Sequence, residues 1–189
     1  MKIEMDSIKI SLSKAALIAG ISLSIMTILS LIIFPSLQAT PYSISGILII
    51  IILDVIVALA LYILLKPVNE KIALLMSLFR IIYAAIFAIA LYNIPDISKF
   101  YSIWDIGLVF FGFHLFFLGY LVFKSKYIPK ILGILLIIAS LGYVIDSFGK
   151  FFLPDYKLTV SMFTFIGEVL FGIWLLFKGR KISNNEPIF

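Results

Sequence analysis

The sequence predicts an all-α membrane protein, a single bundle of six transmembrane helices with both termini in the cytoplasm. Hydrophobic residues make up 63% of the 189 residues and charged residues only 13%, whereas about a quarter of a soluble domain is charged. Six apolar stretches each approach the ~20 residues that a helix needs to cross a bilayer. Lys and Arg gather on one side of these stretches. Residues 1–189 are therefore expected to form one membrane domain, with no room for a separate soluble domain.

The six helices are expected at residues 15–34, 44–65, 72–92, 106–123, 131–148 and 159–177. Pro35 ends the first helix, Asn69 suits the N-cap of the third, and Pro129 suits the first turn of the fifth. The first stretch could instead be a signal peptide. Its N-terminal segment contains acidic residues, and Leu37 stands where a cleavage site needs a small residue, so we expect a membrane span.

The distribution of Lys and Arg around the predicted helices indicates their orientation. Eleven basic residues lie on one side, at Lys2, Lys9, Lys14, Lys66, Lys71, Lys124, Lys126, Lys130, Lys178, Arg180 and Lys181. Three lie on the other side, at Lys99, Lys150 and Lys157. Because cytoplasmic segments are enriched in Lys and Arg, both termini are predicted to be cytoplasmic. The net charge of +5 then suits a lipid bilayer with anionic headgroups as the partner, and not a nucleic acid.

Five of the six apolar stretches each carry one ionisable residue well inside the stretch: Asp54, Arg80, His114, Asp146 and Glu168. A charge in hydrocarbon costs at least ~2.5–3.5 kcal/mol, so such residues normally face the interior of a bundle and find partners there. Four of them are expected ~12–17 Å from the cytoplasmic helix ends, at 1.5 Å of rise per residue. Asp146 is expected ~22 Å deep, nearer the outer face. These five residues form the candidate polar site.

The charges of this candidate site do not balance. Arg80 is always charged and its guanidinium suits carboxylates, so it is expected to pair with Asp54 or Glu168, or with both. Three carboxyl groups outnumber one guanidinium, so at least one carboxyl group is expected to be protonated or to face water. Small and hydroxylated residues share the helix faces of these charges, as close helix contacts in a bilayer require.

The residue content excludes several kinds of site. The chain has no Cys and a single His, which removes thiolate metal sites, a haem held by two histidines and a three-histidine zinc site. A metal held by His114, Asp54 and Glu168 is disfavoured by the charge of Arg80, and no cofactor motif is present. A catalytic triad would need His114 beside a membrane serine, at Ser77, Ser140 or Ser161. No catalytic residue can be assigned from the sequence.

Several polar landmarks also occur together in order and spacing. They are Leu53-Asp54-Val55, Leu65-Lys66-Pro67-Val68-Asn69, Phe79-Arg80, Phe111-Gly112-Phe113-His114, Leu118-Gly119-Tyr120, Tyr127-Ile128-Pro129, Leu141-Gly142-Tyr143, Asp146-Ser147-Phe148 and Gly167-Glu168. In these segments the chain resembles the bacterial membrane family catalogued as domain of unknown function 4386, from about residue 15 to 178. The resemblance implies a six-helix, multi-pass protein of the bacterial inner membrane. It implies no activity.

Three functions are compatible with this pattern. The first is a membrane protein that binds a small ligand, or moves a proton or small solute, at Asp54, Arg80, His114 and Glu168, with Asp146 at the outer mouth. In it, Arg80 anchors an anionic group or neutralises a carboxylate, and His114 exchanges protons with a carboxyl group. The second is an intramembrane enzyme that acts on a lipid or isoprenoid, with His114 as acid or base. The third is a structural or regulatory subunit whose polar network only fixes packing, which leaves open a homo-oligomer or a partner membrane protein.

Overall fold

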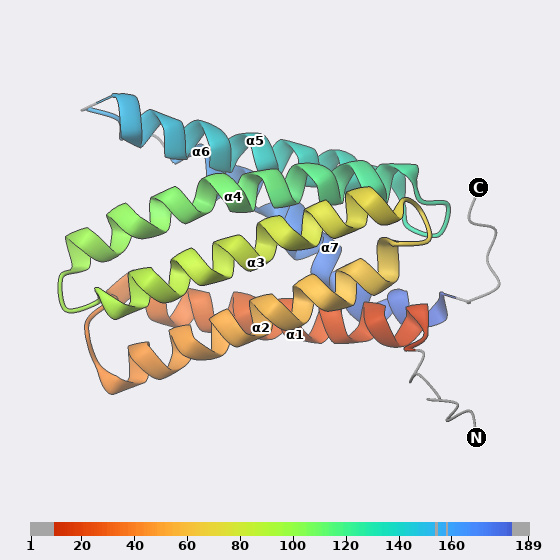
Figure 1. Cartoon of the computed structure of the whole chain (residues 1–189), viewed down its shortest axis with the longest axis horizontal. Helices are drawn as coiled ribbons and strands as arrows, with labels where there is room; N and C mark the ends of the chain where they lie inside the picture. Colours follow the sequence, from red (N-terminus) through yellow and green to blue (C-terminus); the bar gives the residue numbers. More distant parts are fainter. Residues whose placement is uncertain (1–9, 154, 158, 183–189) are drawn as a thin grey trace, which may run out of the picture.

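The computed structural model describes residues 10–153, 155–157 and 159–182, which form helices joined by short loops (Figure 1). Six segments are long and apolar enough to span a membrane. The elements are α1 (Leu12–Ile33), η1 (Phe34–Ser36), α2 (Pro41–Leu65), α3 (Glu70–Tyr92), α4 (Ile97–Lys124), α5 (Lys130–Phe152), α6 (Val160–Thr164), α7 (Ile166–Phe177) and η2 (Gly179–Lys181). The first turn of α1 and the last turn of α7 lie at the same end of the molecule (Figure 1).

The helix starts follow local capping. Asn69 caps α3 as predicted, with its side chain accepting a hydrogen bond from the backbone N–H of Ile72 at 3.1 Å. Asp96 caps α4 in the same way, through the N–H of Lys99. Helix α4 therefore begins at Ile97, and the prediction of a start at residue 106 was wrong. The added turns carry polar residues, so a reading based on hydropathy alone misses them.

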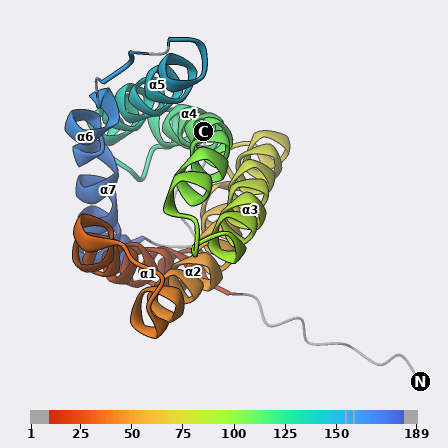
Figure 2. The same ribbon diagram turned by 90° about the vertical axis from the view of Figure 1, so that its left-hand side faces the viewer.

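The sixth predicted span is a pair of helices. Helix α6 ends at Thr164, α7 begins at Ile166, and Phe165 lies at the break between them. Helix α6 packs against α5, whereas α7 packs against both α5 and α1. The break therefore lets the sixth span cross from the side of α5 to the side of α1, as the view along the bundle shows (Figure 2).

The helices form a ring. Each of α1 to α5 packs against the next helix in the chain, and α7 closes the ring by packing against α1 (Figure 2). The closure depends on a close approach, because a Cβ atom at Gly20 would lie 2.6 Å from the backbone nitrogen of Leu176. Gly119 and Gly133 play the same part between α4 and α5. Small residues at helix contacts are the usual means of close packing in a bilayer.

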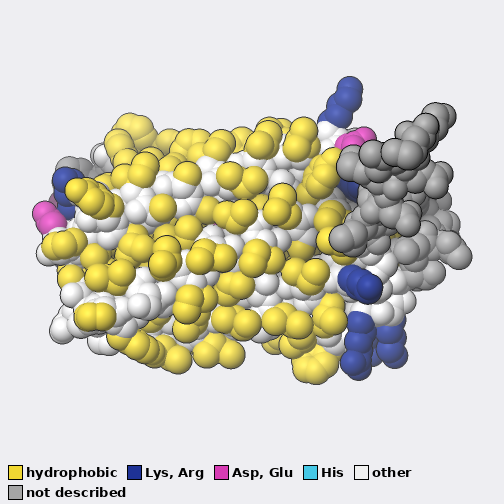
Figure 3. Space-filling view, turned by 60° about the horizontal axis from the view of Figure 1, so that its bottom comes forward, with side chains coloured by type: hydrophobic (Ala, Val, Ile, Leu, Met, Phe, Trp, Pro, Cys, Tyr) yellow, Lys and Arg dark blue, Asp and Glu magenta, His cyan; other side chains and the backbone are white. Residues whose placement is uncertain are grey.

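The outer surface of the ring matches a bilayer. A broad apolar belt covers the middle of the molecule, and the charged side chains in view lie at its two ends (Figure 3). Large side chains within the belt are freely exposed, among them Leu31, Leu59 and Ile138. A soluble protein would expose such a surface to water at a large cost, so the belt is the face that meets lipid.

Candidate functional site

Three of the predicted site residues meet at Arg80, which projects from α3. Its Nη2 atom lies 2.7 Å from Oδ1 of Asp54 on α2, and its Nη1 atom lies 3.0 Å from Nε2 of His114 on α4. All three side chains are buried, with at most 2% of any of them exposed. Arg80 was predicted to pair with Asp54 or Glu168, or with both, and in the structure it pairs with Asp54. A buried pair of this kind holds three neighbouring helices in one arrangement, because separating either partner strands a charge in the interior.

The hydrogen bonds of His114 fix the form of its ring. A guanidinium only donates, so Nε2 must accept from Arg80 and cannot carry a proton. The backbone carbonyl of Met76 only accepts, so Nδ1 must donate to it, at 2.9 Å. His114 is therefore the neutral tautomer with its proton on Nδ1. Both ring nitrogens are occupied, so His114 has no nitrogen left for a serine nucleophile at Ser77, Ser140 or Ser161.

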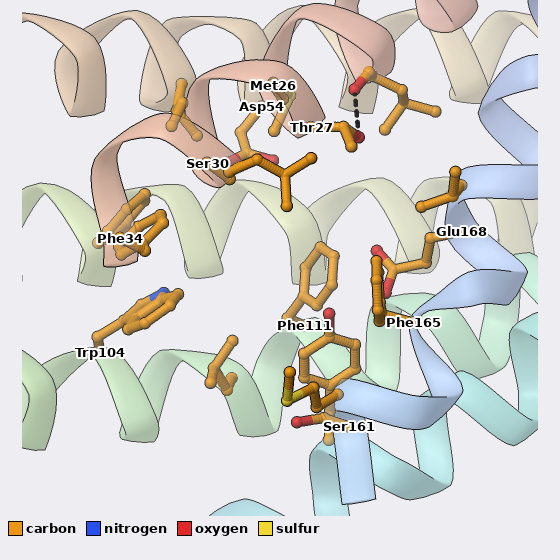
Figure 4. A pocket seen from close by; sticks show the side chains of 18 of the residues that line it. Met26, Thr27, Ser30, Phe34, Asp54, Trp104, Phe111, Ser161, Phe165 and Glu168 are labelled. Carbon is orange, nitrogen blue, oxygen red and sulfur yellow. Dashed lines mark hydrogen bonds between the residues drawn. The ribbon is translucent and has the colours of Figure 1, made fainter. Parts of the chain in front are cut away.

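A cavity of about 700 Å³ lies at the centre of the ring, and residues of all six spans line it (Figure 4). Asp54 and Arg80 form part of one wall, and Glu168 of α7 faces them across the space. The remaining walls are mainly apolar and aromatic, with residues such as Phe34, Trp104 and Phe111. Ligand sites in proteins have this character, with a few polar groups set in an apolar wall.

Several polar atoms of the cavity residues have no hydrogen-bond partner among the described residues. They are Oδ2 of Asp54, Nε of Arg80 and Oε1 of Glu168. Oδ1 of Asp54 is held by the ion pair with Arg80 alone. Buried polar atoms are nearly always paired, and each one left unpaired costs about 1–3 kcal/mol. These three residues come from three helices and all line the one cavity, while the unpaired atoms themselves are buried.

The structure separates the other two predicted residues from this cavity. His114 lies behind Arg80 and is not part of the cavity wall. Asp146 of α5 accepts hydrogen bonds from the Tyr156 hydroxyl and from the backbone N–H groups of Val160 and Ser161. The hydroxyl of Ser161 also donates to it. Asp146 thus holds the start of α6 against α5, instead of standing at the mouth of the cavity as expected.

The Tyr156 hydroxyl belongs to the loop before α6. Its hydrogen bond to Asp146 favours the protonated phenol and raises the pKa of Tyr156 from 10.0 to about 12. Burial and the charge of Asp146 act in the same direction. The Asp146 cluster is thus a local network that fastens the loop and α6 to the C-terminal half of α5.

Some cavity residues were not predicted. Trp104 lines the cavity, donates a hydrogen bond from Nε1 to the Tyr83 hydroxyl at 3.0 Å and stacks on Phe34. Asp105 and Lys150 also line the cavity and form an ion pair of 2.7 Å. The signal available in the sequence is the spacing of Trp104, Leu108 and Phe111, which places them on one face of α4.

Among residues 10–153, 155–157 and 159–182, no three Asp, Glu or His side chains lie close enough together to hold a metal ion. The cavity offers carboxyl groups, one guanidinium, one ammonium group and aromatic rings, and Glu168 forms no ion pair within the described residues. This arrangement can bind and orient a small molecule through charge and hydrogen bonds.

Comparison with known proteins agrees with the resemblance seen in the sequence. The model of the family described as "Domain of unknown function (DUF4386)" matches residues 39–102 and 96–179. A protein of Archaeoglobus fulgidus, described as "Uncharacterized protein", is 58% identical over 158 residues, which cover 84% of this chain and 96% of that protein. No solved structure matches the chain.

Proposed function

The chain belongs to the family described as domain of unknown function DUF4386, and from its central cavity we propose that it binds a small ligand inside the membrane. The observation that carries this proposal is the cavity of about 700 Å³ whose walls hold the unpaired polar atoms of Asp54, Arg80 and Glu168. Cavities for small molecules span roughly 300–1,000 Å³ and are mostly apolar with a few polar groups. Movement of a proton or small solute through this site would use the same groups.

We place the protein in a cell membrane with both termini in the cytoplasm. Six apolar helices and the apolar belt support a membrane location, and the excess of Lys and Arg at one end supports the orientation. The named relative comes from an archaeon, so the membrane is proposed without restriction to a bacterial inner membrane.

Binding is favoured over the other two candidate functions. An intramembrane enzyme would use His114 as an acid or base, and both nitrogens of that ring are occupied away from the cavity. A purely structural network would leave its members paired in a dry core. The Asp54–Arg80–His114 group fits such a role, but Glu168 faces a cavity and has an unpaired oxygen.

The proposal is tested by native mass spectrometry of the protein released from its own membranes. Val169 lines the cavity on α7, so Val169→Trp fills part of the space. Val55→Trp is the matched control, because Val55 faces outward on α2 with 38% of its surface exposed. We expect a bound small molecule with the wild type and Val55→Trp, and its loss in Val169→Trp. The same mass pattern in all three proteins would contradict the proposal.

A further inference from the structure

We propose that the cavity takes an amphipathic organic cation, a protonated amine on an apolar body, which enters from the bilayer between α1 and α6. This inference rests on the proposed function and names its class of ligand. Charge, hydrogen bonding, aromatic lining and the shape of the cavity wall each support it.

The cavity wall has more carboxyl groups than cationic groups. Four of its charged side chains form two ion pairs, Asp54 with Arg80 and Asp105 with Lys150. Glu168 is left without a cation within the described residues. A carboxylate in an apolar cavity is costly unless an opposite charge accompanies it. A cationic ligand supplies that charge at the place where the protein does not.

The unpaired atoms also suit a donor. Glu168 lines the cavity, its Oε1 is an acceptor without a donor, and an ammonium group offers up to three donors and no acceptor. An anionic ligand would need Arg80 or Lys150, and each of them is already paired with a carboxylate, Arg80 with Asp54 and Lys150 with Asp105. The wall therefore favours a cation over an anion.

Aromatic rings surround this space. Tyr83, Trp104, Phe111 and Tyr143 all line the cavity. The faces of aromatic rings attract cations, most strongly where water is excluded. The protein already uses this attraction once, since the Arg80 guanidinium lies over the Phe111 ring at 5.4 Å.

The route to the cavity runs through its apolar side wall. Ile28 and Leu31 of α1 and Met162 of α6 line the cavity and are also 58%, 66% and 66% exposed. The cavity therefore reaches the lipid-facing surface between these helices. The break at Phe165 explains the opening, because α6 follows α5 while α7 crosses to α1 (Figure 2). A ligand that enters here needs an apolar body that dissolves in the bilayer.

The charge preference is tested with decylammonium, decanol and decanoate, which share one chain and differ in the head group. All measurements use the Trp174→Phe protein in nanodiscs. Trp104 in the cavity is then the one remaining tryptophan and reports on binding there. We expect decylammonium to change the Trp104 emission with an affinity at least about tenfold above that of decanol, with decanoate weakest. Val169→Trp is not used here, because it adds a second reporter.

The source of the preference is tested with Glu168→Gln, which should bring decylammonium and decanol to within about threefold of each other. Glu70→Gln is the matched control, since Glu70 lies outside the cavity at the start of α3. Equal binding of the three compounds to the wild type, or tighter binding of decanoate, would overturn the inference and leave the proposed function standing. A Trp104 emission that none of them changes would contradict the proposed function itself. The ranking in the wild type decides the matter even if Glu168→Gln does not fold.

The route is tested by the rate of association. Leu31→Phe enlarges a residue at the opening, and Leu48→Phe makes the same change on the outer face of α2, away from the cavity. We expect decylammonium to associate several times more slowly with Leu31→Phe than with Leu48→Phe. An equal rate for the two variants would contradict entry between α1 and α6.

Discussion

The Arg80 guanidinium donates a hydrogen bond to Nε2 of His114 across 3.0 Å, and this single contact determines which nitrogen of the imidazole carries the proton. The ring in turn donates from Nδ1 to the carbonyl of Met76, on the same helix as Arg80. His114 is thus a positioning residue that ties α4 to α3 and holds Arg80 toward Asp54.

The tautomer of His114 is directly measurable. We expect the ¹⁵N spectrum at pH 7 to show a protonated Nδ1 and an unprotonated Nε2, because Arg80 and Met76 leave no other arrangement. The chain has one His, so labelled histidine gives one unambiguous pair of signals. A proton on Nε2 would contradict the assignment.

Removal of the His114 ring should destabilise the protein. His114→Ala leaves the buried Arg80 without one acceptor, at a cost of about 1–3 kcal/mol, and removes the hydrogen bond that the Met76 carbonyl accepts from another helix. His114→Gln can return an acceptor to Arg80 and should lose less. Unfolding in detergent micelles, followed by circular dichroism, measures both variants. Equal stability of His114→Ala and the wild type would refute the positioning role.

Removal of one partner of the Asp54–Arg80 ion pair should destabilise the protein strongly, whereas apolar replacement of both partners should destabilise it little. Asp54→Asn leaves Arg80 charged in the interior, and we expect a loss of about 3–5 kcal/mol. Asp105→Asn is the matched control, because the Asp105–Lys150 pair is more exposed and should contribute no more than about 1 kcal/mol.

The double variant Asp54→Leu with Arg80→Met removes both charges together. We expect it to recover most of the stability that Asp54→Asn loses, since apolar replacements of a buried pair are often neutral or stabilising. Unfolding curves of the wild type, Asp54→Leu, Arg80→Met and the double variant give the coupling between the two residues. Strictly additive losses would show that the pair does not act as a unit.

The contact between α1 and α7 should depend on the absence of a side chain at Gly20. Gly20→Ala places a methyl group 2.6 Å from the backbone of Leu176, and we expect a loss of about 1–3 kcal/mol. Gly46→Ala is the matched control, because its new methyl group meets the flexible end of the Ile33 side chain. Thermal unfolding should show a larger loss for Gly20→Ala than for Gly46→Ala, and the reverse order would contradict the close approach.

The loop before α6 should loosen at alkaline pH. The folded-state pKa of Tyr156 is about 12 and its ordinary value is 10.0, so the stabilisation from its hydrogen bond is fully present below pH 10 and is lost as the pH rises through 12. Phenolate absorbance should show a step near pH 12 that is missing in Tyr156→Phe. If the absorbance difference between the wild type and Tyr156→Phe titrates with a midpoint at pH 10.0, the ordinary pKa of tyrosine, the hydrogen bond to Asp146 is contradicted.

The sequence predicts the meeting of Asp54, Arg80 and His114 because a charge in hydrocarbon must find partners, and residues on different spans at one depth can reach each other. It places Glu168 in the same layer for the same reason. It does not place Asp146, because depth along a helix says nothing about direction. Asp146 turns toward the start of α6, where backbone N–H groups need an acceptor.

Two features of the fold left little trace in the sequence. The break at Phe165 has no Pro beside it, and the nearby Thr164 and Gly167 are residue types that also occur inside continuous membrane helices. The hydrogen bond that fixes His114 goes to the carbonyl of Met76, and every residue has a carbonyl, so the identity of Met76 gives no hint of it. Both depend on how the helices meet in three dimensions.

The closure of the ring has a consequence for biosynthesis. Helix α1 is made first and packs against α7, which is made last. During synthesis the surface around Gly20 has no helix to pack against until the sixth span is made. The cavity wall that α7 forms opposite the Asp54–Arg80 pair is also missing until then. The cavity is thus completed only when the final helix leaves the insertion machinery, so a chain that stops before α7 inserts its first spans without ever forming the site.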